Sequence, residues 1–216
     1  MINLAHVYKT YSGPVHALRD VSFSIEKGEF VFLTGPSGAG KTTLFKMISA
    51  YDRPTSGQVE IGEYCLSSIA TSDIPYFRRK IGVVFQDFKL LKNKTIFENV
   101  ALPLEIKGDT SQVIKTKVMD TLELLGLQNK WRQYPEFISG GEQQRTAIAR
   151  AIIHQPFVLI ADEPTGNLDH HLAQEIMTVL EKICAQGTTV FVATHDTYLI
   201  DRYKKRRIEI REGCIL

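Results

Sequence analysis

A glycine-rich segment at residues 35–42, called here the phosphate loop, has the spacing that most clearly supports chemistry. It fits G-x-x-x-x-G-K-[S/T] and follows an apolar run, and its glycines let consecutive backbone N–H groups point at phosphate oxygens. A helix beginning near Gly40 adds the positive end of its dipole. We expect Lys41 to reach the β- and γ-phosphates and the Thr42 hydroxyl to ligate Mg²⁺. The predicted phosphate-binding residues are Gly35, Pro36, Ser37, Gly38, Ala39, Gly40, Lys41, Thr42 and Thr43.

The sequence lacks the element that usually recognises a guanine base. A guanine-specific site normally carries an N-K-x-D element. The two Asn-Lys pairs of this chain, at positions 93–94 and 129–130, continue without the aspartate that this element requires. The sequence therefore favours ATP.

Two carboxylates follow an apolar run further along the chain. Asp162 and Glu163 come directly after residues 157–161. An isolated Asp-Glu pair is commonly just the solvated end of a strand, but the buried strand expected before this pair favours a functional one. We expect Asp162 to hold Mg²⁺, directly or through water, and Glu163 to orient or deprotonate the attacking water.

A third segment opens a helical pattern with Ser139, Gly140, Gly141 and Glu142. One interpretation is a capping box, in which Ser139 accepts from the backbone and Glu142 reaches back. Two glycines are costly at a helix start for structure alone, yet they expose N–H groups to an anion at the positive end of the helix. Capping and phosphate binding can both hold here.

These groups need elements that bring them together, and the pattern of the chain predicts an α/β fold of the P-loop NTPase type. Near-continuous apolar runs at residues 30–33, 81–85, 157–161 and 189–193 indicate buried parallel strands. Helical patterns alternate with them, one of which places Leu172, Ile176, Val179, Leu180 and Ile183 on one face.

Two regions depart from this alternation. The first third has short strands with turn signals, such as the turn at residues 54–57 before a strand at 58–61, which predicts an antiparallel β flank. Between residues 87 and 156 helical patterns dominate, as at 116–125 and 142–153. We therefore expect one domain: residues 1–86 and 157–216 form the core with its flank, and residues 87–156 form an inserted helical subdomain.

Composition sets limits on the function. The chain has 216 residues, 44% hydrophobic and 23% charged, with a net charge of +2. This suits one domain with a real core and does not favour nucleic acid as the main partner. A basic run at residues 204–207 is expected to be a solvated surface, with contact to an anionic membrane face as the weaker alternative. Cys65, Cys184 and Cys214 lack metal-ligand spacing and are expected to be incidental thiols.

Neither a signal-peptide pattern nor an apolar run of membrane-spanning length is evident, which predicts a cytoplasmic chain whose membrane role comes from a partner.

Together these segments resemble the ATP-binding cassette (ABC) ATPases, over almost the whole chain. Residues 35–42 match the Walker A motif and residues 157–163 match Walker B, with Glu163 as the catalytic glutamate. Residues 139–143 resemble the signature motif, although Ile138 and Glu142 stand where leucine and glutamine are usual. The resemblance implies a RecA-like parallel sheet core and the activity of an ATPase.

The resemblance assigns further roles. It implies that Tyr11 stacks on adenine, although an ordinary strand aromatic is the plainer interpretation. Gln86 is similar to the Q-loop glutamine that senses Mg²⁺ and water, and His195 to the switch histidine that contacts the γ-phosphate. Asp169, in the D-loop-like stretch at residues 166–169, is implied in the nucleotide site, but it could equally be the N-cap of the next helix. The implied catalytic residues are thus Glu163, His195, Lys41 and Gln86, and the implied metal ligands Thr42, Gln86 and Asp162.

Within the family, the stretches at residues 32–41, 78–87 and 193–196 are most similar to bacterial cell-division ATPases. This resemblance implies a homodimer with two ATP molecules at its interface. It also implies a polytopic membrane partner docking between Gln86 and Asn99 at the cytoplasmic face of the inner membrane, and an output in cell-wall hydrolysis. The alternative is the ATPase of a lipoprotein-releasing or macrolide-type export complex, because such ATPases look similar in these stretches.

Overall fold

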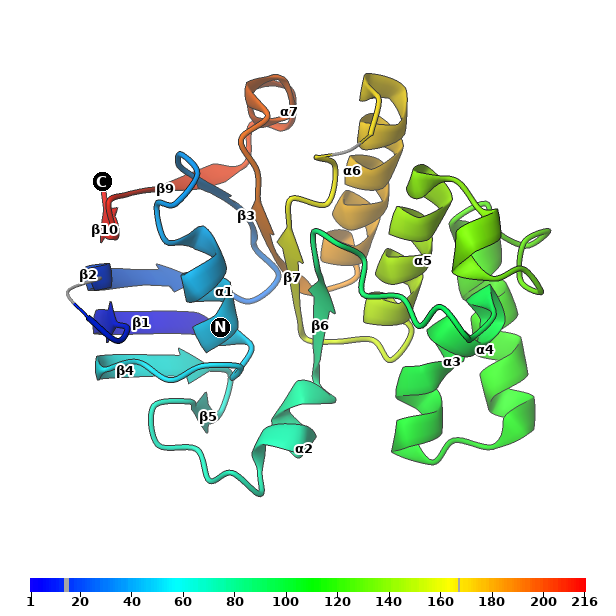
Figure 1. The fold of residues 1–216 in the computed structure, drawn as a ribbon, viewed down its shortest axis with the longest axis horizontal. Helices are drawn as coiled ribbons and strands as arrows, with labels where there is room; N and C mark the ends of the chain where they lie inside the picture. Colours follow the sequence, from blue (N-terminus) through cyan, green and yellow to red (C-terminus); the bar gives the residue numbers. More distant parts are fainter. Residues whose placement is uncertain (14–15, 167) are drawn as a thin grey trace.

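The computed structural model describes residues 1–13, 16–166 and 168–216, which form two sheets and a set of helices (Figure 1). The strands are β1 (Ile2–Thr10), β2 (His16–Ile25), β3 (Phe30–Thr34), β4 (Ser56–Ile61), β5 (Tyr64–Cys65), β6 (Ile81–Val84), β7 (Val158–Asp162), β8 (Thr189–Ala193), β9 (Arg206–Arg211) and β10 (Cys214–Ile215). The helices are α1 (Lys41–Ile48), α2 (Ile74–Arg78), α3 (Ile96–Lys107), α4 (Ser111–Leu124), α5 (Gly140–Ile152), α6 (His170–Ala185) and α7 (Thr197–Tyr203), with a 3-10 turn at Pro135–Phe137.

The larger sheet has the strand order β10-β9-β3-β8-β7-β6, and β9, β3, β8, β7 and β6 pair in parallel. The smaller sheet has the order β2-β1-β4-β5 and is antiparallel. The predicted parallel core and antiparallel flank are therefore confirmed. The run predicted at residues 189–193 coincides with β8, and the other predicted runs differ from β3, β4, β6 and β7 by one or two residues at their ends.

The strands β3, β6, β7 and β8 are largely apolar because both of their faces are buried, whereas β9 carries exposed charged residues. In β3, Phe32 belongs to a core shared with the helices α3–α6, whereas Val31 and Leu33 belong to a core between the two sheets. In β8, Val192 faces the first core and Phe191 the second. A strand with two buried faces has no polar side to alternate with, which explains the continuous apolar runs.

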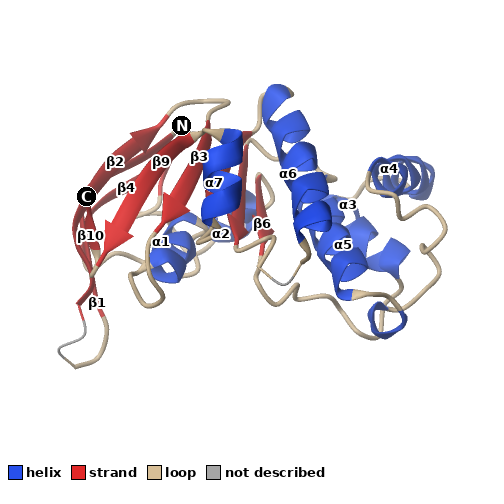
Figure 2. Cartoon of the chain, turned by 90° about the horizontal axis from the view of Figure 1, so that it is seen from above, coloured by secondary structure: helices blue, strands red, loops and turns tan. Residues whose placement is uncertain are grey.

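The helices α3, α4 and α5 lie together at the end of the molecule away from the smaller sheet (Figure 2). They fall between β6 and β7 in the chain, and their buried residues recur every fourth position, as at Ile114, Val118 and Leu122 of α4. Helix α3 packs on α4 and α5, and α5 packs on β6, so this unit is anchored to the edge of the parallel sheet. The subdomain limits at residues 87 and 156 remain a prediction.

The helix predicted around residues 172–183 is α6, which buries a slightly different face. Ala173, Ile176, Met177, Leu180 and Ile183 are buried, while Leu172 and Val179 are half-buried. Among the described residues, no helix has both the length and the apolar character to cross a membrane.

The basic run at residues 204–207 follows the end of α7 and includes the first two residues of β9. Three of its cations are paired: Lys205 with Glu181 at 2.6 Å, Arg206 with Glu29 at 3.1 Å and Arg207 with Glu209 at 3.8 Å. Neighbouring carboxylates thus offset much of its positive charge.

Candidate functional site

A cavity of about 590 Å³, called here the main cavity because the phosphate loop lines it, lies at the carboxyl ends of the parallel strands. The phosphate loop follows β3. Polar residues also lie at the ends of three other strands: Gln86 after β6, Asp162 and Glu163 at β7, and His195 after β8. Parallel strands of one sheet end at the same edge, so residues far apart in the sequence meet there. The cavity is lined by His16, Ala17, Gly35, Pro36, Ser37, Gly38, Gly40, Lys41, Thr42, Thr43, Gln86, Asp162, Glu163 and His195.

The phosphate loop leads into α1 through Gly40, whose φ of 112° lies in the left-handed region. A Cβ here would lie 2.8 Å from the carbonyl oxygen of Ala17, so glycine is required for both conformation and space. No side chain caps the start of α1. Its N–H groups therefore have no side-chain acceptor at the helix start, where an anion would be stabilised.

Lys41 is buried, and its ammonium donates to the carbonyl oxygens of Gly35 at 2.7 Å and Pro36 at 3.0 Å. Both acceptors belong to the phosphate loop itself. A cation bound only to neutral carbonyls in a buried position is a strong candidate for a phosphate partner.

Asp162 and Thr42 meet at this site, since the Thr42 hydroxyl donates to Asp162 Oδ2 at 3.2 Å. Burial raises the pKa of Asp162, with the charge of Glu163 adding to the effect, and the Thr42 hydrogen bond opposes it. Among the described residues Asp162 forms no ion pair, and no cluster of three or more His, Cys, Asp or Glu side chains could hold a metal. A hydroxyl and a carboxylate are hard oxygen donors of the kind Mg²⁺ takes alongside phosphate oxygens, so the residues fit that ion.

The two carboxylate oxygens of Glu163 each contact one polar side chain. His195 Nδ1 lies 3.1 Å from Glu163 Oε1, and Gln86 Nε2 donates to Oε2 at 3.5 Å. A carboxylate only accepts, so this geometry puts a hydrogen on His195 Nδ1. Glu163 also has a φ of 48°, a left-handed conformation that costs about 1–3 kcal/mol in a residue other than glycine. The fold holds this carboxylate in a strained and oriented position.

Tyr11 lies outside the main cavity. It lines an adjacent cavity of about 370 Å³, to which Thr42 and Asp162 also contribute. Its hydroxyl donates to Asp52 Oδ2 at 2.9 Å, and burial together with Asp52 raises the pKa of Tyr11. The ring is therefore next to the phosphate loop, and its role in stacking on adenine remains a prediction.

The start of α5 is capped as the sequence allows. The Glu142 carboxylate accepts from the Ser139 N–H at 2.8 Å, and the Ser139 hydroxyl accepts from the Glu142 N–H at 3.3 Å. A Cβ at Gly141 would overlap the Leu172 side chain, whereas a Cβ at Gly140 would meet nothing within 4 Å. A side chain at Gly141 would thus have to displace Leu172 of α6, whereas Gly140 leaves open space. None of residues 139–141 lines the main cavity.

Asp169 is the N-cap of α6, where its carboxylate accepts from the Leu172 N–H at 2.9 Å. The capping alternative for this residue is therefore confirmed. Asp169 does not line the main cavity, and its role at a nucleotide remains a prediction. Asn167, in the same D-loop-like stretch, lies outside the described residues.

Two residues that line the cavity, His16 and Ala17, have no signal in the sequence. They lie at the start of β2, and only the packing of the flank brings them to the phosphate loop. No local pattern could have identified them.

Comparison with known proteins agrees with this geometry. Residues 18–166 match the family described as ABC transporter. The cell division ATP-binding protein FtsE of Bacillus subtilis is 51% identical over 216 residues, which cover 100% of this chain and 95% of that protein. FtsE of Escherichia coli is 43% identical over 213 residues, covering 99% of this chain and 96% of the relative. The chain belongs to the ABC transporter family.

This ABC chain also matches solved structures. A dimeric structure of the ATP-binding cassette MJ0796 in a post-hydrolysis state, bound to ADP and Pi, has a TM-score of 0.93 at 37% identity and covers 100% of this chain and 96% of its own. A second dimeric structure of MJ0796 has the same TM-score at 38% identity, with the same shares of both chains covered. As a member of this family, the chain binds ATP and hydrolyses it to ADP and phosphate.

Proposed function

We propose that this ABC ATPase works as a homodimer with two ATP molecules at its interface and drives a polytopic membrane partner similar to FtsX in bacterial cell division. The relatives named FtsE support the division role, and the dimeric MJ0796 structures support the assembly. The output would be regulation of cell-wall hydrolysis. The chain would lie at the cytoplasmic face of the inner membrane, held there by its partner.

The observation that carries the proposal is the separation of two helix starts. The main cavity brings together Lys41, Glu163 and His195, but residues 139–141 lie outside it. A glycine with open space before it, at the positive end of a capped helix, suits a phosphate that arrives with another chain. A site shared by two chains explains why both features are present.

In this dimer each residue has a defined task. Lys41 and the backbone of the phosphate loop would hold the β- and γ-phosphates, while residues 139–141 of the second copy would close on the γ-phosphate. Thr42, Asp162 and Gln86 would hold Mg²⁺, which offsets phosphate charge when bound. Glu163 would orient and deprotonate the attacking water, with Gln86 and His195 fixing its two oxygens. Loss of the γ-phosphate would remove the charge that joins the two chains.

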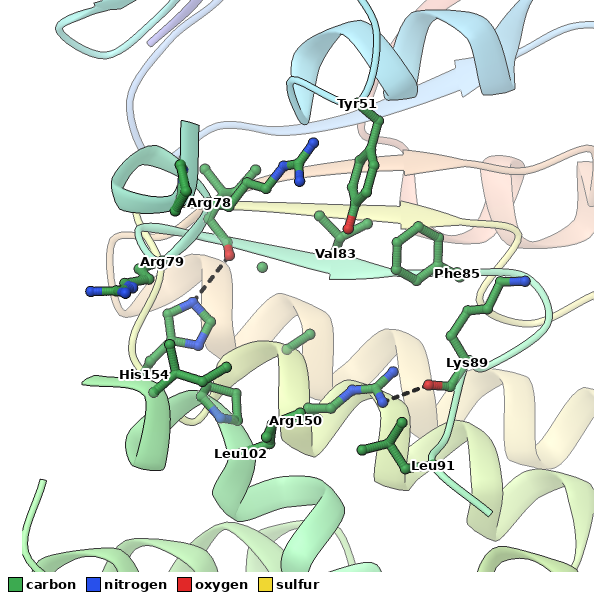
Figure 3. Close-up of a pocket in the computed structure, with 16 residues that line it drawn as sticks. Tyr51, Arg78, Arg79, Val83, Phe85, Lys89, Leu91, Leu102, Arg150 and His154 are labelled. Carbon is green, nitrogen blue, oxygen red and sulfur yellow. Dashed lines mark hydrogen bonds between the residues drawn. The ribbon is translucent and has the colours of Figure 1, made fainter. Parts of the chain in front are cut away.

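The partner would dock near the loop that follows Gln86. A cavity of about 550 Å³ opens there, between α2, α3, α5 and β6 (Figure 3). Val83 and Phe85 line it, as do Leu102 and Ile106 of α3. We call this cavity the groove. An apolar groove beside Gln86 could transmit movement of a docked segment to the ATP site.

The test is to trap the assembly. A tagged Glu163→Gln chain is expressed in its own cell, membranes are solubilised with ATP and Mg²⁺, and co-purifying proteins are identified. Recovery of a polytopic protein with an extracytoplasmic domain, together with division proteins, is expected. Recovery of a lipoprotein-releasing or macrolide-export permease would replace the division role. Ribosomes or DNA in place of any membrane protein would refute the proposal.

A further inference from the structure

One arginine of α5, the helix that begins at residues 139–141, reaches across the groove to the loop that follows Gln86. Arg150, near the end of α5, donates from Nη1 to the carbonyl oxygen of Lys89 at 2.7 Å (Figure 3). Its Nη2 donates to the carbonyl oxygen of Phe88, also at 2.7 Å. Two short bonds from one planar guanidinium to two successive carbonyls form a two-point clamp, whose rigid planar fork and reach a lysine ammonium on its flexible stem does not supply.

The clamped segment does not have a favourable backbone of its own. Phe88 and Lys89 have φ angles of 59° and 48°, so two successive residues other than glycine are left-handed. The backbone bonds within the turn are the Phe88 N–H to the Phe85 carbonyl at 3.1 Å and the Lys89 N–H to the Asp87 carbonyl at 2.6 Å. The exposed Lys89 ammonium also pairs with Asp87 Oδ2 at 2.6 Å. Strained conformations of this kind persist only where surrounding structure holds them.

The guanidinium has no carboxylate partner among the described ion pairs. Burial lowers the pKa of Arg150 from its ordinary value, yet an arginine remains charged under these conditions. The charge could be explained as a favourable cation in the last turn of α5. That explanation does not account for the two Nη groups, which extend to the loop and not to carbonyls of the helix itself.

We propose that Arg150 is a positioning residue for ATP hydrolysis, clamping the turn after Gln86 and thereby fixing the Gln86 amide against Glu163. Gln86 lies two residues before Phe88, and its Nε2 is 3.5 Å from Glu163 Oε2. Movement of the clamped turn would therefore change the position of Gln86 at the carboxylate.

The clamp also connects the two halves of the proposed shared site. Helix α5 begins at residues 139–141 and carries Arg150 about 16 Å further along its axis, at 1.5 Å per residue. A rigid helix that binds ATP of the second copy at one end would thus hold the glutamine of its own chain's ATP site near the other. This consequence rests on the proposed dimer, whereas the clamp itself does not.

The experiment compares Arg150→Lys with wild type in the isolated, full-length chain. Amide hydrogen exchange followed by mass spectrometry should rise at least about tenfold in residues 86–91, the change expected when charge-assisted hydrogen bonds are lost, with the core strands unchanged. Turnover at saturating ATP and Mg²⁺ should fall about tenfold, with KM for ATP within about twofold. Arg145→Lys is the matched control, because Arg145 lies on the same helix and pairs with Glu175 at 3.8 Å instead of with the loop.

Unchanged exchange in residues 86–91, or an equal rise over the whole chain in both variants, would overturn the assignment. Arg150→Gln, which keeps a donor but loses the fork and the charge, replaces Arg150→Lys should that variant not fold. The exchange measurement needs no membrane partner and decides whether Arg150 holds the turn. The turnover measurement decides whether that clamp positions Gln86 for hydrolysis, and unchanged turnover in Arg150→Lys would overturn that role. A failed clamp therefore leaves the proposed partner untouched, and a failed partner leaves the clamp untouched.

Discussion

Two helices of this ATPase, α1 and α5, begin at glycines, and their starts differ in side-chain capping and in the polar groups around them. At α1 no side chain caps the helix, and the groups for chemistry, among them Asp162 and Glu163, line the same cavity. At α5 Ser139 and Glu142 cap the helix, and no part of residues 139–141 lines that cavity. At the first helix start, one chain supplies nearly all of the polar groups that the site needs. The second helix start is capped but has no such groups beside it, and a second copy of the chain would supply them.

The largest expected effect concerns the polar groups beside the start of α1. Glu163→Gln keeps the size of the side chain but removes the base, so turnover should fall by about 10²–10⁴ while ATP binding is retained. Steady-state kinetics and equilibrium ATP binding measure the two properties separately. Glu123→Gln, on the exposed face of α4, is the control and should leave both unchanged. Normal turnover in Glu163→Gln would exclude this residue as the base.

A mixing experiment tests whether the start of α5 serves another chain. Lys41→Ala disables the phosphate loop, and Gly140→Asp places a negative charge in open space at the start of α5, where it would repel a phosphate. Each variant alone should be inactive. Mixed in equal amounts, half the dimers should combine both chains and regain one intact site, giving about a quarter of the wild-type sites. Turnover that stays absent in the mixture would mean that each chain contains its whole site.

The two glycines of α5 should separate in their effects on stability. Gly141→Ala forces a methyl group against Leu172 and should cost about 1–3 kcal/mol of unfolding free energy. Gly140→Ala has room and should be neutral or stabilising by less than about 1 kcal/mol. Urea unfolding compares the midpoints of the two variants with wild type. Equal losses would contradict the division into a packing glycine and an open one.

The smallest effect concerns the far end of α5. His154, just beyond it, contacts the Ile81 carbonyl through Nε2 at 3.1 Å, and burial lowers its pKa below the ordinary 6.5. The unfolded chain then binds more protons between the two pKa values, so stability should fall as the pH drops below about 6.5, by at most about 1.4 kcal/mol per pH unit.

Urea unfolding at a series of pH values measures this slope. His154→Gln should flatten it, whereas His6→Gln, which alters a histidine exposed beside Asp20, should not. An unchanged slope in His154→Gln would assign the acid sensitivity to other groups.

The sequence by itself determined the chemistry of the site, because that chemistry depends on short spacings. The Gly-Lys-Thr end of the phosphate loop, the carboxylates after an apolar run and the serine before two glycines each lie within a few residues, where backbone geometry fixes their relation. The same locality explains why β3, β7 and β8 could be predicted. Two buried faces require continuous apolar residues, and that requirement is visible in the chain.

Only the tertiary structure decided which groups meet. The sequence alone does not distinguish the roles of Gly140 and Gly141, yet in the fold Leu172 of α6 packs against one of them and leaves open space at the other. His16 reaches the phosphate loop because the β flank folds onto the sheet, and Arg150 reaches Phe88 across 62 residues of chain. Such contacts join segments through a shared core, and no local spacing encodes them.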